Sequence, residues 1–93
     1  MTAPLLQNNE ELFNYLVALS DHLRSRGQIE LAKVVKTASR FAFGSQSEFL
    51  SEAQDALKKV RSGNSNVLDQ EQISEITSII HQIQVAFIKV GGA

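Results

Sequence analysis

The feature that most constrains the fold of this chain is a long apolar pattern in its last third. Apolar residues recur there at alternating spacings of three and four, which places them on one side of an α-helix. A strand-like alternation over Ile83, Val85 and Phe87 is much shorter, so the helical pattern decides. The sequence therefore predicts a long amphipathic helix whose inward stripe comprises Ile73, Ile76, Ile80, Ile83, Phe87 and Val90.

Start and stop signals divide the rest of the chain into three more helices. Gly27 and Gly44 follow helical patterns, where glycine commonly ends a helix, and residues 61–67 have loop composition throughout. Three residue pairs have the spacing of a capping box, namely Asn8 with Glu11, Ser45 with Glu48, and Asp69 with Gln72. After a tail of residues 1–7, the predicted helices span about 9–25, 29–43, 46–61 and 70–90.

The short links between these helices predict the fold class. A chain of 93 residues has room for one core, so we expect a single domain over 1–93. Each short link forces neighbouring helices to run in opposite directions. The predicted fold is all-α, a four-helix antiparallel up-down-up-down bundle. Two packed helical hairpins in a less regular arrangement are the alternative.

Composition narrows the classes of protein that the chain can belong to. With 43% hydrophobic and 20% charged residues, it has the make-up of an ordinary globular chain. The net charge of −1 provides no overall attraction to nucleic acid or to an anionic membrane. Residues 1–7 lack the features of a signal peptide, and no apolar run is long enough to span a membrane. The default expectation is a cytoplasmic protein.

The sequence lacks the residue patterns that usually carry catalysis or bind metal. The chain has no cysteine, and neither His22 nor His81 completes a Glu-x-x-His pair, because Leu19 and Ser78 stand three residues before them. No glycine-rich phosphate loop or nucleophile motif is present. We therefore predict a protein that is not an enzyme and that needs no cofactor or metal.

A basic face on the second predicted helix raises the possibility of nucleic-acid binding. Lys33, Lys36 and Arg40 fall on one side of that helix. Elsewhere, basic residues gather at predicted helix ends and acidic residues at helix starts, which is what favourable interaction with helix dipoles produces. Weak nucleic-acid binding is kept only as an alternative.

Several apolar residues lie away from the inward-facing side of their helices. Their side chains would be exposed to water unless another segment or another molecule packs on them. Val85 and Ile88 are displaced on the last helix, and Ile29 and Phe43 on the second. One explanation is internal, because Leu5 and Leu6 of the tail can fold over Val85 and Ile88 in an up-down bundle. The other is contact with a partner protein or with a second copy. These six residues, Leu5, Leu6, Ile29, Phe43, Val85 and Ile88, form the candidate interface.

The sequence thus predicts a small non-enzymatic helical protein that acts through protein-protein contact or self-association. A second possibility is an apolar small molecule bound in the core between the first and last helices. It is suggested by large aromatic residues beside small ones, although close packing of large against small side chains is the commoner explanation of such a pattern. The residues concerned are Phe13, Phe41, Phe49 and Phe87, with Ala38, Ala53 and Ala56.

Overall fold

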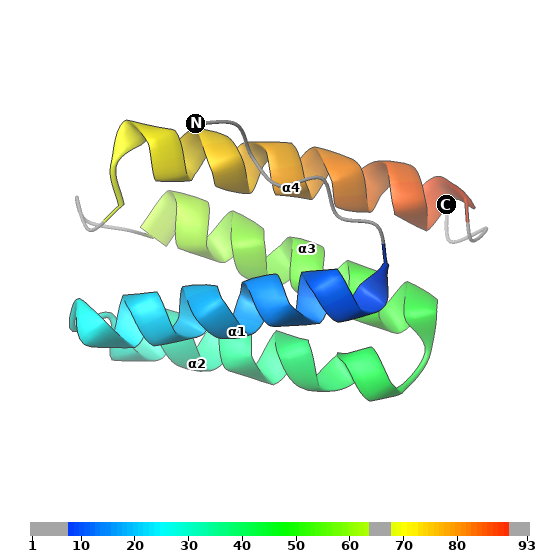
Figure 1. Cartoon of the computed structure of the whole chain (residues 1–93), viewed down its shortest axis with the longest axis horizontal. Coiled ribbons are helices and arrows are strands. Elements are labelled where there is room, and N and C mark those ends of the chain that lie inside the picture. The colour runs from blue at the N-terminus through cyan, green and yellow to red at the C-terminus, as the bar shows by residue number, and fades with distance from the viewer. Residues whose placement is uncertain (1–7, 64–67, 90–93) are drawn as a thin grey trace.

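The computed structural model describes residues 8–63 and 68–89, which contain four α-helices and one short 3-10 helix and no strand. The elements are α1 (Asn9–Ser25), α2 (Ile29–Ser39), η1 (Arg40–Phe43), α3 (Gln46–Gly63) and α4 (Gln70–Lys89). The predicted all-α class is confirmed. Successive helices run in opposite directions, so the start of α1 and the end of α4 lie at the same end of the molecule (Figure 1).

The predicted helix starts at Asn8 and Asp69 are confirmed by their hydrogen bonds. The Glu11 backbone N–H donates to Asn8 Oδ1 at 2.9 Å. At the start of α4 the box is reciprocal: the Gln72 N–H donates to Asp69 Oδ1 at 2.8 Å, and the Asp69 N–H donates to Gln72 Oε1 at 3.0 Å. Backbone donors that a helix start leaves unpaired are thus satisfied by local side chains.

The turns on either side of α2 also follow the sequence signals. Gly27 has a φ of 81°, the left-handed conformation that favours glycine at a helix end. At the start of α3 the Glu48 N–H donates to Ser45 Oγ at 3.4 Å, so this cap forms as predicted. Both α1–α2 and η1–α3 links are therefore set by residues next to them in sequence.

Two predicted boundaries are wrong. The second helix was expected to stay α-helical to residue 43, but α2 ends at Ser39 and continues as η1. With about three residues per turn, a 3-10 helix places Arg40 and Phe43 over one another, and both are exposed. The third helix was expected to stop near residue 61, yet α3 includes Gly63. The remaining part of the predicted loop, residues 64–67, lies outside the described residues. Val90, the last residue of the predicted stripe, lies outside them as well.

The core is built from one face of each helix. On α4, Ile76, Ile80 and Ile83 are buried as predicted, and Ile79 is also fully buried although it was left out of the predicted stripe. On α1, Leu12, Leu16 and Leu23 are buried, whereas Leu19 is only partly buried. The largest fully buried side chains include Phe49, Leu16, Leu23, Leu57, Ile76, Ile79 and Ile83.

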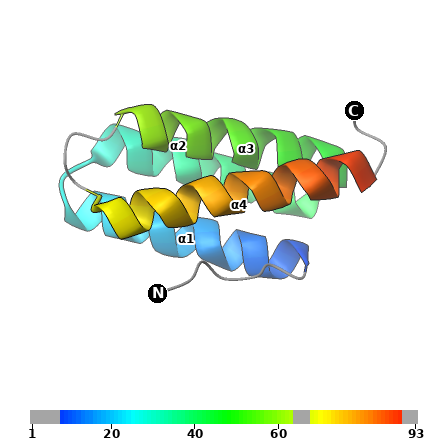
Figure 2. The ribbon, with the colours of Figure 1, turned by 90° about the horizontal axis from the view of Figure 1, so that it is seen from above.

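The helices pack unequally around this core. Each helix packs closely on the next one in the chain, whereas the backbones of α1 and α4 stay further apart. Figure 2 shows α4 alongside α3 and α1. On the tight α1–α2 side, the buried Ser20 hydroxyl donates to the Ala32 carbonyl at 3.0 Å. The wider space between α1 and α4 is called the α1–α4 seam below.

Candidate functional site

The most exposed apolar residues of α4 are Val85 and Ile88, here called the α4 patch. Their exposed fractions are 41% and 66%. Residues three apart on a helix are neighbours, so the two side chains adjoin on the side of α4 away from Ile83 and the core. Between Ile76 and Ile88 the sequence contains no Asp, Glu, Lys or Arg. The patch therefore belongs to a nearly uncharged helix surface.

The other candidate interface residues do not join this patch. Ile29 is 44% exposed and Phe43 is 83% exposed, but they lie at opposite ends of the α2–η1 segment. The Phe43 ring packs edge-to-face on Phe13 of α1, with ring centroids 5.5 Å apart. Leu5 and Leu6 lie outside the described residues. The structure thus leaves a pair of apolar residues on α4 and two separate ones elsewhere.

The predicted basic face shares its surroundings with carboxylates. Lys33 and Arg40 are exposed and Lys36 is partly buried. Lys33 Nζ lies 3.9 Å from a Glu30 carboxylate oxygen, and Asp55 lines the same groove between α2 and α3 as Lys33. Because opposite charges alternate here, the positive potential that phosphate groups require is weakened.

The α1–α4 seam is bridged by polar side chains that come from distant parts of the sequence. Gln72 Nε2 lies 3.2 Å from His22 Nε2. The Gln72 oxygen already accepts from the Asp69 N–H, so its amide nitrogen faces the ring and donates to it. Gln72 therefore caps α4 and links it to the end of α1.

A second bridge joins Tyr15 of α1 to Glu75 of α4. Burial raises the pKa of the Tyr15 hydroxyl far above its ordinary value, and the Glu75 charge and a hydrogen bond to Glu75 raise that pKa further. All three causes disfavour the phenolate. Tyr15 therefore stays a neutral donor to a carboxylate.

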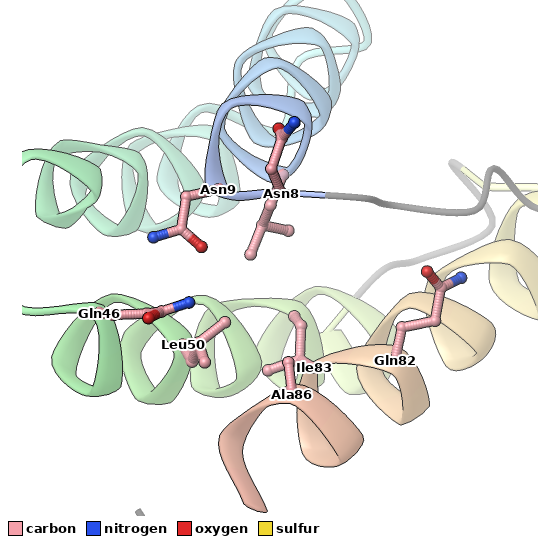
Figure 3. A pocket seen from close by; sticks show the side chains of 8 residues that line it. Asn8, Asn9, Gln46, Leu50, Gln82, Ile83 and Ala86 are labelled. Atoms are coloured by element: carbon pink, nitrogen blue, oxygen red, sulfur yellow. The ribbon is translucent and has the colours of Figure 1, made fainter. Parts of the chain in front are cut away.

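Two hollows lie along this seam, and both open to solvent. One of about 230 Å³ is lined by Tyr15, Ala18, Leu19, His22, Gln72, Glu75 and Ile76. The other, of about 110 Å³, is shown in Figure 3 and is lined by Asn8, Asn9, Leu12, Gln46, Leu50, Gln82, Ile83 and Ala86. Both are smaller than the ~300 Å³ at the lower end of small-molecule sites. The small residues proposed to flank a core ligand, Ala38, Ala53 and Ala56, are buried.

Neither seam bridge was predicted from the sequence. Gln72 was assigned only to a capping box, and Tyr15 was not among the candidate site residues. The antiparallel order of α1 and α4 is the signal that could have paired the start of α4 with the end of α1. Which side chains of α1 and α4 contact each other depends on the distance between the two helices, and periodicity does not give that distance.

The described residues contain neither a metal-binding cluster nor a membrane-spanning helix. Within residues 8–63 and 68–89, no group of three or more His, Cys, Asp or Glu residues could hold a metal ion. No helix in this described part is long and apolar enough to cross a membrane. Comparisons with protein-family models, curated proteins and solved structures found no match. A function must therefore be inferred from the chain's own surface.

Proposed function

We propose that this protein acts without catalysis, through contact of the α4 patch with another protein, and that a second copy of the chain is that partner. The observation that carries the proposal is the exposure of Val85 and Ile88 on a stretch of α4, residues 76–88, that contains no Asp, Glu, Lys or Arg, with Lys89 directly after it. Depletion of charged residues distinguishes the centre of protein interfaces from other surface.

The patch alone is too small for a stable interface, because each partner of a standard interface buries about 800 Å². The contact must extend along α4, whose exposed neighbours Thr77, His81 and Gln84 are polar and carry no carboxylate or ammonium. A twofold axis across the helix would place the same surface on both copies. Val85 and Ile88 would then lie at the apolar part of a mainly polar contact.

The alternatives from the sequence have less support. The seam hollows are small and open, which disfavours an apolar ligand held in the core. Lys33 stands beside carboxylates, which disfavours nucleic acid. Contact through α4 needs neither a cavity nor a charged surface.

Mass measured by light scattering over a range of concentrations tests the proposal. We expect the wild-type chain to approach twice its monomer mass as concentration rises, and the Val85→Glu, Ile88→Glu variant to stay monomeric. The charge-matched control is Asn14→Glu, Thr37→Glu, which alters exposed positions on α1 and α2 and should behave as wild type.

A wild-type chain that is monomeric at every concentration rules out self-association. Contact with a different protein would then be tested by affinity capture with the intact chain and the same two variants. Equal capture of a protein by wild type and by the α4 variant would exclude the patch as the contact surface.

A further inference from the structure

His81 is the one ionisable side chain in the stretch of α4 that is proposed to make the contact. Residues 76–88 contain no Asp, Glu, Lys, Arg or Tyr, so His81 alone can gain a charge there. Its side chain is exposed. Histidine is the side chain whose ordinary charge change falls between pH 5 and pH 8. The charge of this surface is therefore set by the pH of its surroundings.

Helix geometry places His81 in line with the α4 patch. His81, Val85 and Ile88 follow one another at spacings of four and three, so they lie on one side of the helix. All three are exposed, on the side of α4 away from the buried Ile83. A contact that covers Val85 and Ile88 along the helix therefore covers His81 as well.

We infer that His81 makes the association of two copies depend on its protonation, with pairing when the ring is neutral and separation when it is charged. A twofold axis that crosses α4 between His81 and Ile88 places the His81 ring of each copy against the α4 patch of the other. A charged ring would lose its hydration against these apolar side chains, and the contact would hold two like charges. The inference rests on the proposed function, because it names how the same contact is regulated.

The charged groups of α3 add to this effect. Helices α3 and α4 run antiparallel (Figure 1), and an Arg61 guanidinium nitrogen donates to Thr77 Oγ1 at 3.3 Å, about one turn before His81. Lys58, three residues before Arg61, is exposed near the level of His81. Both side chains stay positively charged throughout the range in which histidine titrates. They oppose a further positive charge but cause no pH dependence themselves.

The remaining neighbours lie at the seam or at the end of α4. Glu75 is bonded to Tyr15, and His22 contacts Gln72, all at the α1–α4 seam. Lys89 directly follows the α4 patch. Carboxylates and lysine keep their charges, and tyrosine stays neutral, between about pH 5.5 and pH 8. Among the described residues, only the two histidines are of a type that titrates in this range.

The dimer dissociation constant, measured by sedimentation equilibrium at about pH 8 and about pH 5.5 and at one ionic strength, tests the inference. We expect it to rise about tenfold or more at the lower pH for the wild-type chain. His81→Gln, which stays neutral, should pair equally at both values. His81→Lys, which is charged at both, should be mainly monomeric even at the higher pH. His22→Gln is the matched control and should respond to pH as wild type does.

Circular dichroism of each protein at both pH values shows whether the helices stay folded, so that loss of pairing is not mistaken for unfolding. A wild-type dissociation constant that is equal at both pH values would overturn the inference and leave the proposed contact intact. A pH response that persists in His81→Gln, or disappears in His22→Gln, would also overturn it. A wild-type chain that is monomeric at both values would overturn self-association and the inference together.

Discussion

Helix α1 meets its two flanking helices in different ways. Toward α2 it presents the buried Ser20, whose hydroxyl reaches the Ala32 carbonyl at 3.0 Å. Toward α4 it presents Tyr15 and His22, which reach Glu75 and Gln72 through their side-chain ends. At the α1–α2 contact, a short side chain of α1 therefore reaches the backbone of α2 directly. At the α1–α4 contact, long side chains of both helices meet end to end, so the two backbones lie further apart.

The difference shows how residue size at a helix contact sets the spacing between helices. Interhelix distances vary with the side chains at the contact, and small residues allow the closest approach. Ala32 is such a residue and is fully buried, whereas Ala18 on the other side of α1 lines an open hollow. The same residue type is thus a close-packing position at one contact and a surface position at the other.

Enlarging the two alanines should give the largest contrast. Ala32→Leu should lower the free energy of unfolding by about 1–3 kcal/mol, because the added methylenes have no space. The matched change Ala18→Leu should alter it by less than about 0.5 kcal/mol, since this residue is exposed. Urea unfolding followed by circular dichroism measures both. Similar losses in the two variants would contradict the difference in packing.

Truncation of Gln72 should have the next largest effect. Gln72→Ala removes a cap of α4 and the bridge to His22, so the free energy of unfolding should fall by about 1–2 kcal/mol. His22→Ala removes only the bridge and should cost less. A double-mutant cycle isolates their coupling, and a coupling near zero would mean that the bridge contributes nothing. Gln70→Ala, at an exposed neighbouring position, is the control.

Tyr15 should give the smallest effect at neutral pH and a distinct one in alkali. Tyr15→Phe should lower the free energy of unfolding by about 0.5–1.5 kcal/mol through the lost hydrogen bond. The raised pKa means that the folded state holds the phenolic proton more tightly than the unfolded state. The resulting stability is fully present below the unfolded pKa of about 10 and is lost as pH rises above it.

Tyr15 is the only tyrosine, and the chain has no tryptophan, so ultraviolet absorbance follows its ionisation alone. We expect ionisation in native protein to be shifted well above pH 10 and to return to about pH 10 in urea. Lysines also titrate in this range, so the wild-type curve of stability against pH is compared with that of Tyr15→Phe. Parallel curves for the two proteins above pH 10 would contradict a perturbed Tyr15.

Local signals in the sequence were sufficient for much of the fold. The caps at Asn8 and Asp69 and the turn at Gly27 depend on residues within a few positions of one another, and all three are observed. The candidate interface was also partly predictable, because Val85 and Ile88 lie outside the three-four stripe and are exposed. The predicted end of α2 was wrong, because the apolar pattern there fits both an α-helix and a 3-10 helix.

The sequence by itself therefore determined the all-α class, the starts of the helices and the apolar residues left outside the stripes, because short-range hydrogen bonding and periodicity act within one helix. Only the tertiary structure decided that Ile79 is buried, that Leu19 is partly exposed, and that open hollows lie between α1 and α4. The physical reason is that periodicity gives the direction of a helix's apolar side, whereas the positions of the neighbouring helices decide how much of that side is buried and how far apart the helices lie.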